Sequence, residues 1–231
     1  MSVVIALAAY NEAKNIGPVI RRLVELGYEC VVVDDGSADD TFATAEAAGA
    51  RVARHHSNLG QGHAILTGFM LALLDPQCEI IVTMDSDGQH APEEIVLFLD
   101  KMKETGADMV VGSRVLGRPA ERNHALRRWF APLYTQILNR ASGYELSDAL
   151  TGFRAFRRSS VEREMAMLGQ MLEPQYLTAE LLIRLGRRGF KVDEVAVNIR
   201  SRVHGVSTKG LLRMGFGILR AVFRTLIDNR S

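Results

Sequence analysis

The sequence lacks the features of a secreted or membrane-spanning protein. Of its 231 residues only two are cysteines, Cys30 and Cys78; both border apolar runs, so we expect reduced core residues rather than a disulfide framework. No basic, apolar and small-residue succession precedes the apparent strand at Val3, which argues against a signal peptide. The longest apolar run, residues 65–74, is shorter than the roughly 20 residues that a membrane-spanning helix needs. These absences favour a cytoplasmic protein.

Two common nucleotide-binding patterns are also missing. The chain contains no Walker phosphate loop. The glycine fingerprint of dinucleotide-binding proteins is incomplete, because Ile65 stands where a third glycine should follow Gly60 and Gly62. A phosphate-loop kinase and a dehydrogenase are therefore disfavoured.

Charge is divided unevenly along the chain. Residues 1–113 carry 7 Lys and Arg against 17 Asp and Glu, a net charge of −10, whereas residues 114–231 carry 21 against 10, a net charge of +11. An acidic half can hold a divalent cation, and a basic half can bind phosphates or approach an anionic membrane. Two solvated surfaces that pair with each other are the simpler alternative.

Short apolar runs rich in Val and Ile alternate with longer segments of helical period. Strands are predicted at residues 3–9, 30–33, around 52, 80–84, 109–112 and 191–199, and a turn followed by a strand at residues 148–157. Helices between successive strands imply an α/β domain with a mainly parallel, Rossmann-like sheet flanked by helices. Polar clusters follow three of the strands, at residues 10–12, 34–37 and 85–87, and we expect them to converge on one cleft.

The third polar cluster has the composition of a metal site. Asp85 and Asp87 are carboxylates separated by one residue, and with Gln89 they offer oxygen ligands for Mg²⁺ or Mn²⁺, which would bridge a diphosphate. A solvated turn is the alternative, since Asp-x-Asp alone is a weak pattern. His90, where a glycine is needed, argues against a calcium loop. Gln89, where threonine is typical, argues against a phosphatase nucleophile.

Five ordered motifs resemble one protein family. AAYNEAKNI (8–16), VVVDDGSADDT (31–41), NLGQGHAILTGF (58–69), MDSDGQHAPEEI (84–95) and VGSR (111–114) are similar in order and spacing to glycosyltransferase family 2, which has the GT-A fold. LSDALTGFRAFRR (146–158) and RSRVHGVSTKG (200–210) resemble its dolichyl-phosphate mannosyltransferase branch. The resemblance implies a metal-dependent transferase that moves a sugar from a GDP- or UDP-sugar to a polyprenyl phosphate.

The resemblance also implies roles for individual residues. The nucleotide sugar would contact Ala8, Tyr10, Glu12, Asp35 and Asp85, and the metal would be held by Asp85, Asp87 and Gln89. The acceptor phosphate would be held by Arg114 with Arg127 or Arg128, and a loop over the donor phosphates would contain Arg202, Ser207 and Lys209. Asp87, Arg114 and Arg202 would carry catalysis. Two residues have local alternatives: Asp35 as a cap of the following helix, and Glu12 as a partner of Lys14 or of its helix start.

The C-terminal segment suggests a membrane contact without reference to a family. We divide the chain into a catalytic domain, residues 1–208, and an amphipathic helix, residues 209–231. On a helix, four basic residues fall within about 60° of one another, and apolar residues cover the remaining face. The four are Lys209, Arg213, Arg220 and Arg224. Such a helix can lie in a lipid interface at the inner face of the cell membrane, or pack on the core or a dimer partner.

A phosphate acceptor would simplify the chemistry. Its second pKa is about 6, so the nucleophile is already anionic and no strong base is needed. A metal at Asp87 and cations such as Arg202 would stabilise the departing diphosphate, and attack opposite the leaving group predicts inversion. One alternative is a saccharide hydroxyl acceptor, with Asp148 or Glu180 as base; another is a non-enzymatic membrane-associated binding module. We expect no nucleic-acid partner.

Overall fold

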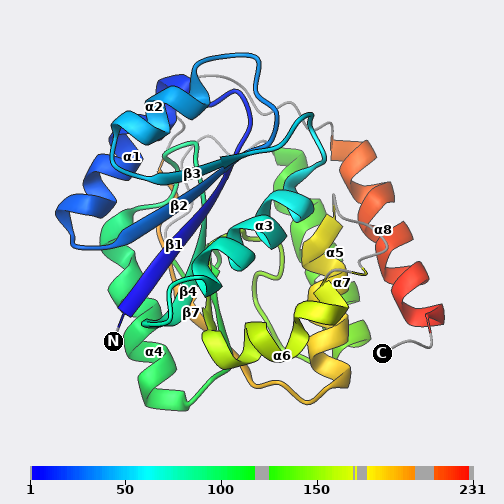
Figure 1. Cartoon of the computed structure of the whole chain (residues 1–231). Coiled ribbons are helices and arrows are strands. Elements are labelled where there is room, and N and C mark those ends of the chain that lie inside the picture. The colour runs from blue at the N-terminus through cyan, green and yellow to red at the C-terminus, as the bar shows by residue number, and fades with distance from the viewer. Residues whose placement is uncertain (1, 118–124, 169, 171–175, 201–210, 229–231) are drawn as a thin grey trace.

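The computed structural model describes residues 2–117, 125–168, 170, 176–200 and 211–228 (Figure 1), with the side chains of residues 125–129, 166–168 and 211–214 excepted. The strands are β1 (Ser2–Ala9), β2 (Glu29–Asp34), β3 (Arg51–Arg54), β4 (Cys78–Asp85), β5 (Met109–Ser113), β6 (Arg154–Arg157) and β7 (Val192–Ala196). The helices are α1 (Ala13–Glu25), α2 (Thr41–Ala47), α3 (Gln61–Leu73), α4 (Ile95–Thr105), α5 (Ala125–Ser142), α6 (Arg158–Leu168), α7 (Leu177–Arg187) and α8 (Leu211–Ile227), with a 3₁₀ turn at Pro92–Glu94.

The described strands form one sheet in the order β3-β2-β1-β4-β6-β5-β7. Every neighbouring pair is parallel except the two that involve β6, which runs antiparallel to both β4 and β5. The prediction of a mainly parallel sheet is confirmed. In the antiparallel pairing of β4 and β6, Thr83 stands opposite Arg154. The beginning of β6 therefore lies at the carboxyl end of β4.

Apolar side chains cover both faces of the sheet. Along β1, Val3, Ile5 and Leu7 pack in one core with α1, α2 and α4, whereas Val4 and Ala6 point into a second core. The second core includes side chains from α3, α5, α6, α7 and α8. Figure 1 shows these helices together, on the side away from α1 and α2. Because side chains alternate across a strand, a run buried on both faces reads as continuously apolar, as 3–9 does.

Helix α8 is packed on one side and exposed on the other. Ile218, Ala221 and Val222 are buried in the second core, together with parts of α5 and α7. At Gly217 the helix approaches Tyr176 so closely that a Cβ atom would overlap its ring. The outward side exposes Phe216 and Phe223. One face of α8 therefore packs on the core, as one of the expected alternatives has it, and contact of the other face with a lipid interface stays a prediction.

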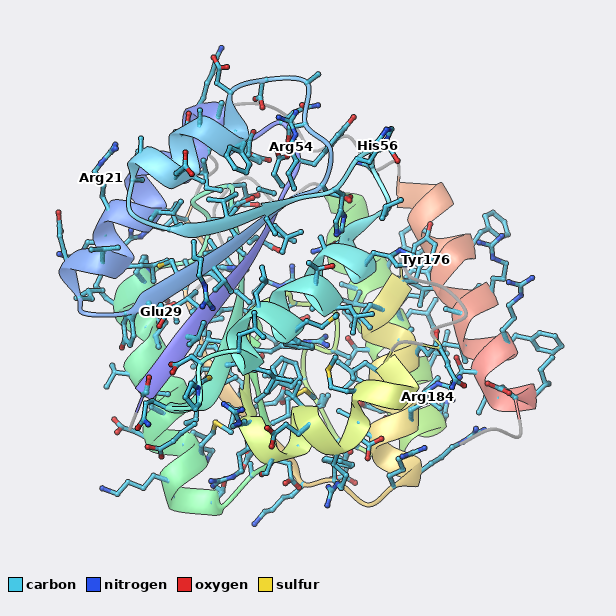
Figure 2. The ribbon with its side chains drawn as sticks, in the orientation of Figure 1. Arg21, Glu29, Arg54, His56, Tyr176 and Arg184 are labelled. Atoms are coloured by element: carbon cyan, nitrogen blue, oxygen red, sulfur yellow. The ribbon has the colours of Figure 1, made fainter. Side chains whose placement is uncertain are left out.

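Buried charges connect α7 to the end of α8. Arg184 donates from Nε to Glu180 Oε1 at 2.9 Å and from Nη2 to Asp228 Oδ2 at 2.7 Å. The side chains of Arg184 and Glu180 are only 3% and 1% exposed. Figure 2 shows Arg184 between the two helices, and Arg187 adds hydrogen bonds to the carbonyl oxygens of Thr225 and Leu226. These contacts fix the C-terminal end of α8 to α7.

Both cysteines are buried free thiols, as expected. Burial raises the pKa of Cys30 to about 12 and that of Cys78 to about 11, which keeps both thiols protonated and unreactive near neutrality. Within the described ranges, none of the helices combines the length and the apolar character needed to cross a bilayer.

The buried arginine of α7 should matter far more to stability than a comparable surface arginine. Arg184→Met removes the buried cation that is bonded to Glu180 and Asp228, and we expect the free energy of unfolding to fall by about 3 kcal/mol or more. The matched control is Arg22→Met, which removes a 2.8 Å ion pair with Glu93 between side chains that are 44% and 41% exposed. Urea unfolding should find the control nearly unchanged. Equal losses in the two variants would contradict this account of α7 and α8.

Candidate active site

The ends of three neighbouring strands are held together by hydrogen bonds. Ser86, just after β4, donates from Oγ to the carbonyl oxygen of Ala8 in β1 at 3.0 Å. Asp35, just after β2, donates its backbone N–H to the carbonyl oxygen of Ala9 at 2.8 Å. The three polar clusters predicted from the sequence therefore lie at one edge of the sheet.

The turn after β1 is held by the segment after β2. Asn11 has a φ of 54° and donates its backbone N–H to Ser37 Oγ at 2.8 Å, while its Oδ1 accepts from Ala38 N at 2.9 Å. Glu12 stands at the start of α1, where its carboxylate accepts a hydrogen bond of 2.7 Å from Asn15 Nδ2. Tyr10, on this turn, is 47% exposed and accessible to a ligand.

Asp35 organises the segment that leads into α3. The side chain of Asp35 is 5% exposed, and its carboxylate accepts hydrogen bonds from His55 Nδ1 at 2.7 Å, Leu59 N at 2.9 Å and Gly60 N at 2.8 Å. The alternative that Asp35 caps the following helix is wrong, because the cap position of α2 is Asp40. A nucleoside contact by Asp35 stays a prediction. Through these bonds Asp35 also positions the beginning of α3, beside the end of β4.

Asp85 is the exposed carboxylate at the end of β4, with 41% of its side chain exposed. Its Oδ1 lies 3.4 Å from Gln61 Nε2, and its Oδ2 lies 3.9 Å from His90 Nε2. The backbone N–H of Asp85 donates to His90 Nδ1 at 3.2 Å, so the ring proton of a neutral His90 sits on Nε2, toward the carboxylate. His90 is itself fixed by stacking on Phe153 at 4.8 Å.

His90 therefore holds the backbone of Asp85, five residues before it, and places its Nε2 atom 3.9 Å from the carboxylate. The sequence pointed to His90 only as an argument against a calcium loop. The local sequence did not predict the contact between His90 and Asp85, because His90 is positioned by Phe153, which comes from a distant segment.

Asp87 and Gln89 form the turn beyond Asp85. Gln89 donates its backbone N–H to Asp87 Oδ1 at 3.0 Å, and its carbonyl oxygen accepts from Arg200 N at 2.9 Å. Its side chain donates to the carbonyl oxygen of Arg200 at 3.4 Å. The turn is thereby tied to the chain just before residues 201–210, which contain the predicted donor loop.

The donor set suits a hard cation that shares its coordination with phosphate. Among the described residues, no group of three or more His, Cys, Asp or Glu side chains is arranged to hold a metal. Mg²⁺ does not require such a cage, because it typically keeps several waters and uses one or two carboxylates with substrate phosphates. Asp85, Asp87 and Gln89 fit this second kind of site.

Gly152 is required by the position of Asp85. A Cβ atom at residue 152 would lie 2.8 Å from Asp85 Oδ1. Residue 152 precedes β6, which pairs with β4, so the two residues approach each other across the sheet. The sequence alone gave no reason to connect this glycine with the acidic pair.

Arg114 forms a bidentate ion pair at the end of β5. Its Nε lies 2.6 Å from Asp148 Oδ2 and its Nη2 lies 2.9 Å from Asp148 Oδ1, while the backbone N–H of Arg114 donates to Oδ2 at 3.1 Å. Burial by itself would raise the pKa of Asp148, but the hydrogen bonds and charge of Arg114 outweigh it and lower that pKa. Asp148 is therefore held as an anion, and Arg114 keeps its charge.

Glu194 of β7 holds the backbone of the segment that carries Asp148. Its carboxylate accepts hydrogen bonds from Ser147 N at 2.6 Å and from Asp148 N at 3.0 Å. These bonds fix the backbone that carries Asp148. The sequence analysis missed Glu194, because its contacts join segments more than 40 residues apart.

The remaining predicted residues are placed only in part. Arg127 and Arg128 lie in the first turns of α5, but their side chains are outside the described residues. Arg202, Ser207 and Lys209 also lie outside the described residues. Glu180, the alternative base, is described: it is 1% exposed and bonded to Arg184.

Comparison with known proteins gives a family and several relatives. The model of the family described as glycosyl transferase family 2 matches residues 2–164. Polyprenol monophosphomannose synthase of Mycolicibacterium smegmatis is 31% identical, over 95% of this chain and 84% of the relative. Dolichyl-phosphate hexose transferase of Haloferax volcanii is 30% identical, over 98% of this chain and 94% of the relative.

A solved structure has the same fold. Glucosyl-3-phosphoglycerate synthase from Mycobacterium tuberculosis, in complex with Mn²⁺, uridine diphosphate and phosphoglyceric acid, superposes with a TM-score of 0.72. The match covers 100% of this chain and 80% of that chain, at 23% sequence identity. The α/β fold is therefore GT-A-like, as the resemblance implied.

The lowered pKa of Asp148 predicts a pH-dependent contribution to stability. A carboxyl whose pKa is lower in the folded state stabilises the fold above its unfolded value of about 3.9, and this stability is lost as the pH falls through the folded value. We expect Asp148→Asn to reduce the free energy of unfolding by about 3 kcal/mol at pH 6, because it leaves Arg114 without its anion.

Urea unfolding at pH 6 and at steps below pH 4 measures this contribution. The difference between wild type and Asp148→Asn should shrink as the pH falls. Glu162→Gln, at an exposed ion pair with Arg158, is the control and should change stability little. A difference for Asp148→Asn that stays constant with pH would rule out the proposed ionisation.

Proposed function

This chain belongs to glycosyl transferase family 2, and we propose that it transfers a sugar, with inversion, from a GDP- or UDP-sugar to a polyprenyl phosphate. The observation that carries the proposal is the edge of the sheet where Asp85 and Asp87 follow β4 beside the ends of β1 and β2. Ligands of open α/β sheets bind at such carboxyl edges.

The donor would bind along this edge. In the proposed complex Tyr10, Glu12 and Asp35 contact the nucleoside and Ala8 lies beside it, while Asp85, Asp87 and Gln89 hold Mg²⁺ or Mn²⁺. When bound, the metal supplies positive charge that stabilises the departing diphosphate. The solved GT-A neighbour that binds Mn²⁺ and uridine diphosphate supports this assignment by analogy of fold.

The proposed acceptor follows from the ion pairs of the two candidate bases, Asp148 and Glu180. A sugar hydroxyl acceptor would need a carboxylate that can take a proton. Asp148 is paired with Arg114 and has a lowered pKa, and Glu180 is buried against Arg184, so both are poorly suited to that task. A phosphate acceptor needs no such base. The names of the two relatives, a polyprenol and a dolichyl-phosphate transferase, point to the same class of acceptor.

Arg114 would meet the acceptor phosphate. Asp148 binds its Nε and Nη2, which leaves the remaining guanidinium nitrogen for a phosphate oxygen and fixes the plane of the group. We propose that Arg127 or Arg128 completes the acceptor site, and that Arg202, Ser207 and Lys209 close over the donor phosphates.

A lipid acceptor requires contact with a membrane, and we propose that residues 209–231 provide it. The outward face of α8 exposes a row of apolar side chains: Phe216, Leu219, Phe223, Leu226 and Ile227. At 100° per residue, the exposed Arg220 and Arg224 lie along one side of this row. An apolar row bordered by basic residues fits the surface of an anionic bilayer at the inner face of the cell membrane.

Asp87→Asn tests the donor site. The carboxamide cannot supply the charge that attracts a cation, so we expect transfer to polyprenyl phosphate to fall by about 100-fold or more. The metal-dependent thermal shift given by GDP or UDP should also be lost, because a ligand stabilises only the state that binds it. Asp100→Asn, on the exposed side of α4, should leave transfer and shift unchanged.

The same assay should offer an oligosaccharide and a polyprenyl phosphate in parallel, and follow labelled sugar into the lipid phase. An Asp87→Asn variant with normal transfer would refute the metal assignment. Wild-type transfer to the oligosaccharide alone would refute the lipid acceptor.

Substitution of the two most exposed phenylalanines of α8 tests the membrane contact. Phe216 and Phe223 are 74% and 64% exposed, so their replacement should not disturb the core. We expect each change to serine to weaken binding to phosphatidylglycerol-containing vesicles by about tenfold, from the lost apolar burial. Leu97→Ser, at an exposed position of α4, is the control. Equal sedimentation of all variants with vesicles would exclude α8 as the contact.

A further inference from the structure

Arg154 lies on the same face of the sheet as Asp85, deeper in the protein. Side chains alternate along β4, so Ile81, Thr83 and Asp85 lie on the same face. In the antiparallel pairing with β6, Phe156 stands opposite Ile81 and Arg154 stands opposite Thr83. Arg154 is therefore one step of the pleat deeper than Asp85, about 6 to 7 Å along the strand.

Arg154 is a buried cation with little to balance it. It is 3% exposed and donates to two backbone carbonyl oxygens, Thr151 O at 3.0 Å and Ala149 O at 3.0 Å. Within the described part of the chain it forms no ion pair, and Asp148 and Asp85 act on it only through longer-range attraction. Burial lowers the pKa of Arg154 to about 10, so the group is still charged at neutral pH.

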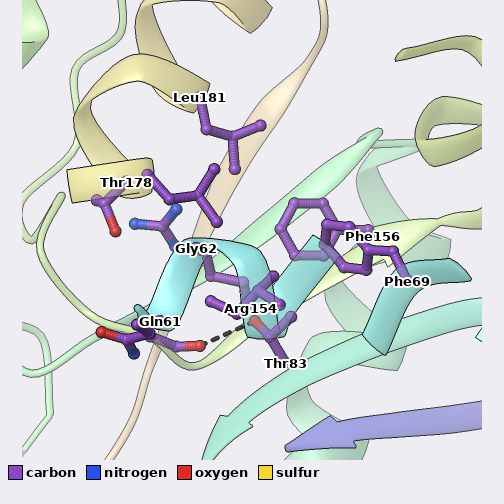
Figure 3. Close-up of a pocket in the computed structure, with 11 residues that line it drawn as sticks. Gln61, Gly62, Phe69, Thr83, Arg154, Phe156, Thr178 and Leu181 are labelled. Atoms are coloured by element: carbon purple, nitrogen blue, oxygen red, sulfur yellow. Dashed lines mark hydrogen bonds between the residues drawn. The ribbon is translucent and has the colours of Figure 1, made fainter. Parts of the chain in front are cut away.

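A buried charge without a direct counter-ion is costly, and the fold retains this one next to a cavity. The cavity has a volume of about 40 Å³, which exceeds the roughly 10 to 15 Å³ that one water requires. Its polar lining comes from Gln61, Thr83, Arg154 and Thr178, and Phe69 and Leu181 contribute to an apolar wall (Figure 3). The size and lining suit one small substituent that has both carbon and oxygen atoms.

The cavity opens beside the proposed diphosphate site. Gln61 lines it and also lies 3.4 Å from Asp85 Oδ1, and Gly152 lines it at a position where a Cβ atom would lie 2.8 Å from Asp85 Oδ1. In a nucleotide sugar the sugar ring is attached directly to the second phosphate. A diphosphate held at Asp85 and Asp87 would therefore bring the substituents of the sugar close to the cavity.

We propose that this cavity is a subsite for an oxygen-bearing substituent of the donor sugar, with the Arg154 guanidinium as its hydrogen-bond donor. The inference rests on the proposed function, since it assumes a nucleotide sugar at Asp85. A carboxylate, a carbonyl or a hydroxyl oxygen can each accept from a guanidinium, and a carboxylate would also neutralise the buried charge. Arg154 would thus determine which sugar the enzyme accepts.

The competing role for Arg154 is to hold the backbone of residues 149–151 through its two carbonyl contacts. That role predicts equal losses for every ligand at the site, because the loop lies next to Asp85. Binding through the substituent predicts a loss for sugar nucleotides only. The two roles therefore separate when a nucleoside diphosphate is compared with its sugar derivatives.

Isothermal titration with Mn²⁺ makes the comparison, using GDP, UDP and their hexose, acetamido-hexose and hexuronic acid derivatives. We expect Arg154→Met to weaken binding of at least one sugar nucleotide by about tenfold or more, the usual effect of losing a hydrogen bond to a charged group. Binding of the free nucleoside diphosphate should change less than about twofold. The sugar with the largest loss identifies the substituent, and Arg154→Lys should recover part of it.

Thr178→Leu is the second variant, because it reduces the cavity without touching the carbonyl contacts of Arg154. It should weaken sugar nucleotides selectively as well, which keeps the proposal testable if Arg154→Met does not fold. Equal losses for nucleoside diphosphates and sugar nucleotides, or no loss in either variant, would overturn the subsite. Failure of the wild type to bind any of these ligands would instead refute the proposed function.

Discussion

The pairing of the antiparallel strand β6 with β4 determines what surrounds Asp85. It places Gly152 against the Asp85 carboxylate and Arg154 opposite Thr83, one step deeper on the same face. The same strand pairing sets the loop before β6 beside the end of β5, where Asp148 binds Nε and Nη2 of Arg114. Strand β6 thus brings Asp85, from the acidic half of the chain, close to residues of the basic second half.

The basic half is therefore organised by specific acidic partners. Glu194 fixes the backbone of Asp148, Asp148 fixes Arg114, and Glu180 with Asp228 neutralises Arg184. The charge and hydrogen bonds of Arg114 lower the pKa of Asp148, so this carboxylate is poorly suited to accept a proton. This distribution of charge suits an acceptor that arrives already ionised, such as a phosphate.

Local sequence patterns predicted most of the sheet, because apolar runs and helical periodicity depend on near neighbours. They also predicted the convergence of the three polar clusters, because the carboxyl ends of parallel strands lie at the same edge of a sheet. They did not predict the direction of β6, helix α6 or the contacts of His90, Arg154 and Glu194, which depend on pairings between distant segments. For Asp35, the sequence left a nucleoside contact and a helix cap as alternatives, and it did not predict the hydrogen bonds to His55, Leu59 and Gly60.

The account depends most on the claim that the edge after β4 binds a metal and a diphosphate. A crystal structure of the protein with Mn²⁺ and GDP or UDP, read from the anomalous signal of manganese, tests it most directly. We expect a manganese peak bound by Asp85 or Asp87 oxygen atoms and by the diphosphate, with the nucleoside lying toward Tyr10. A nucleotide bound away from these carboxylates, with manganese absent from this edge, would contradict the account.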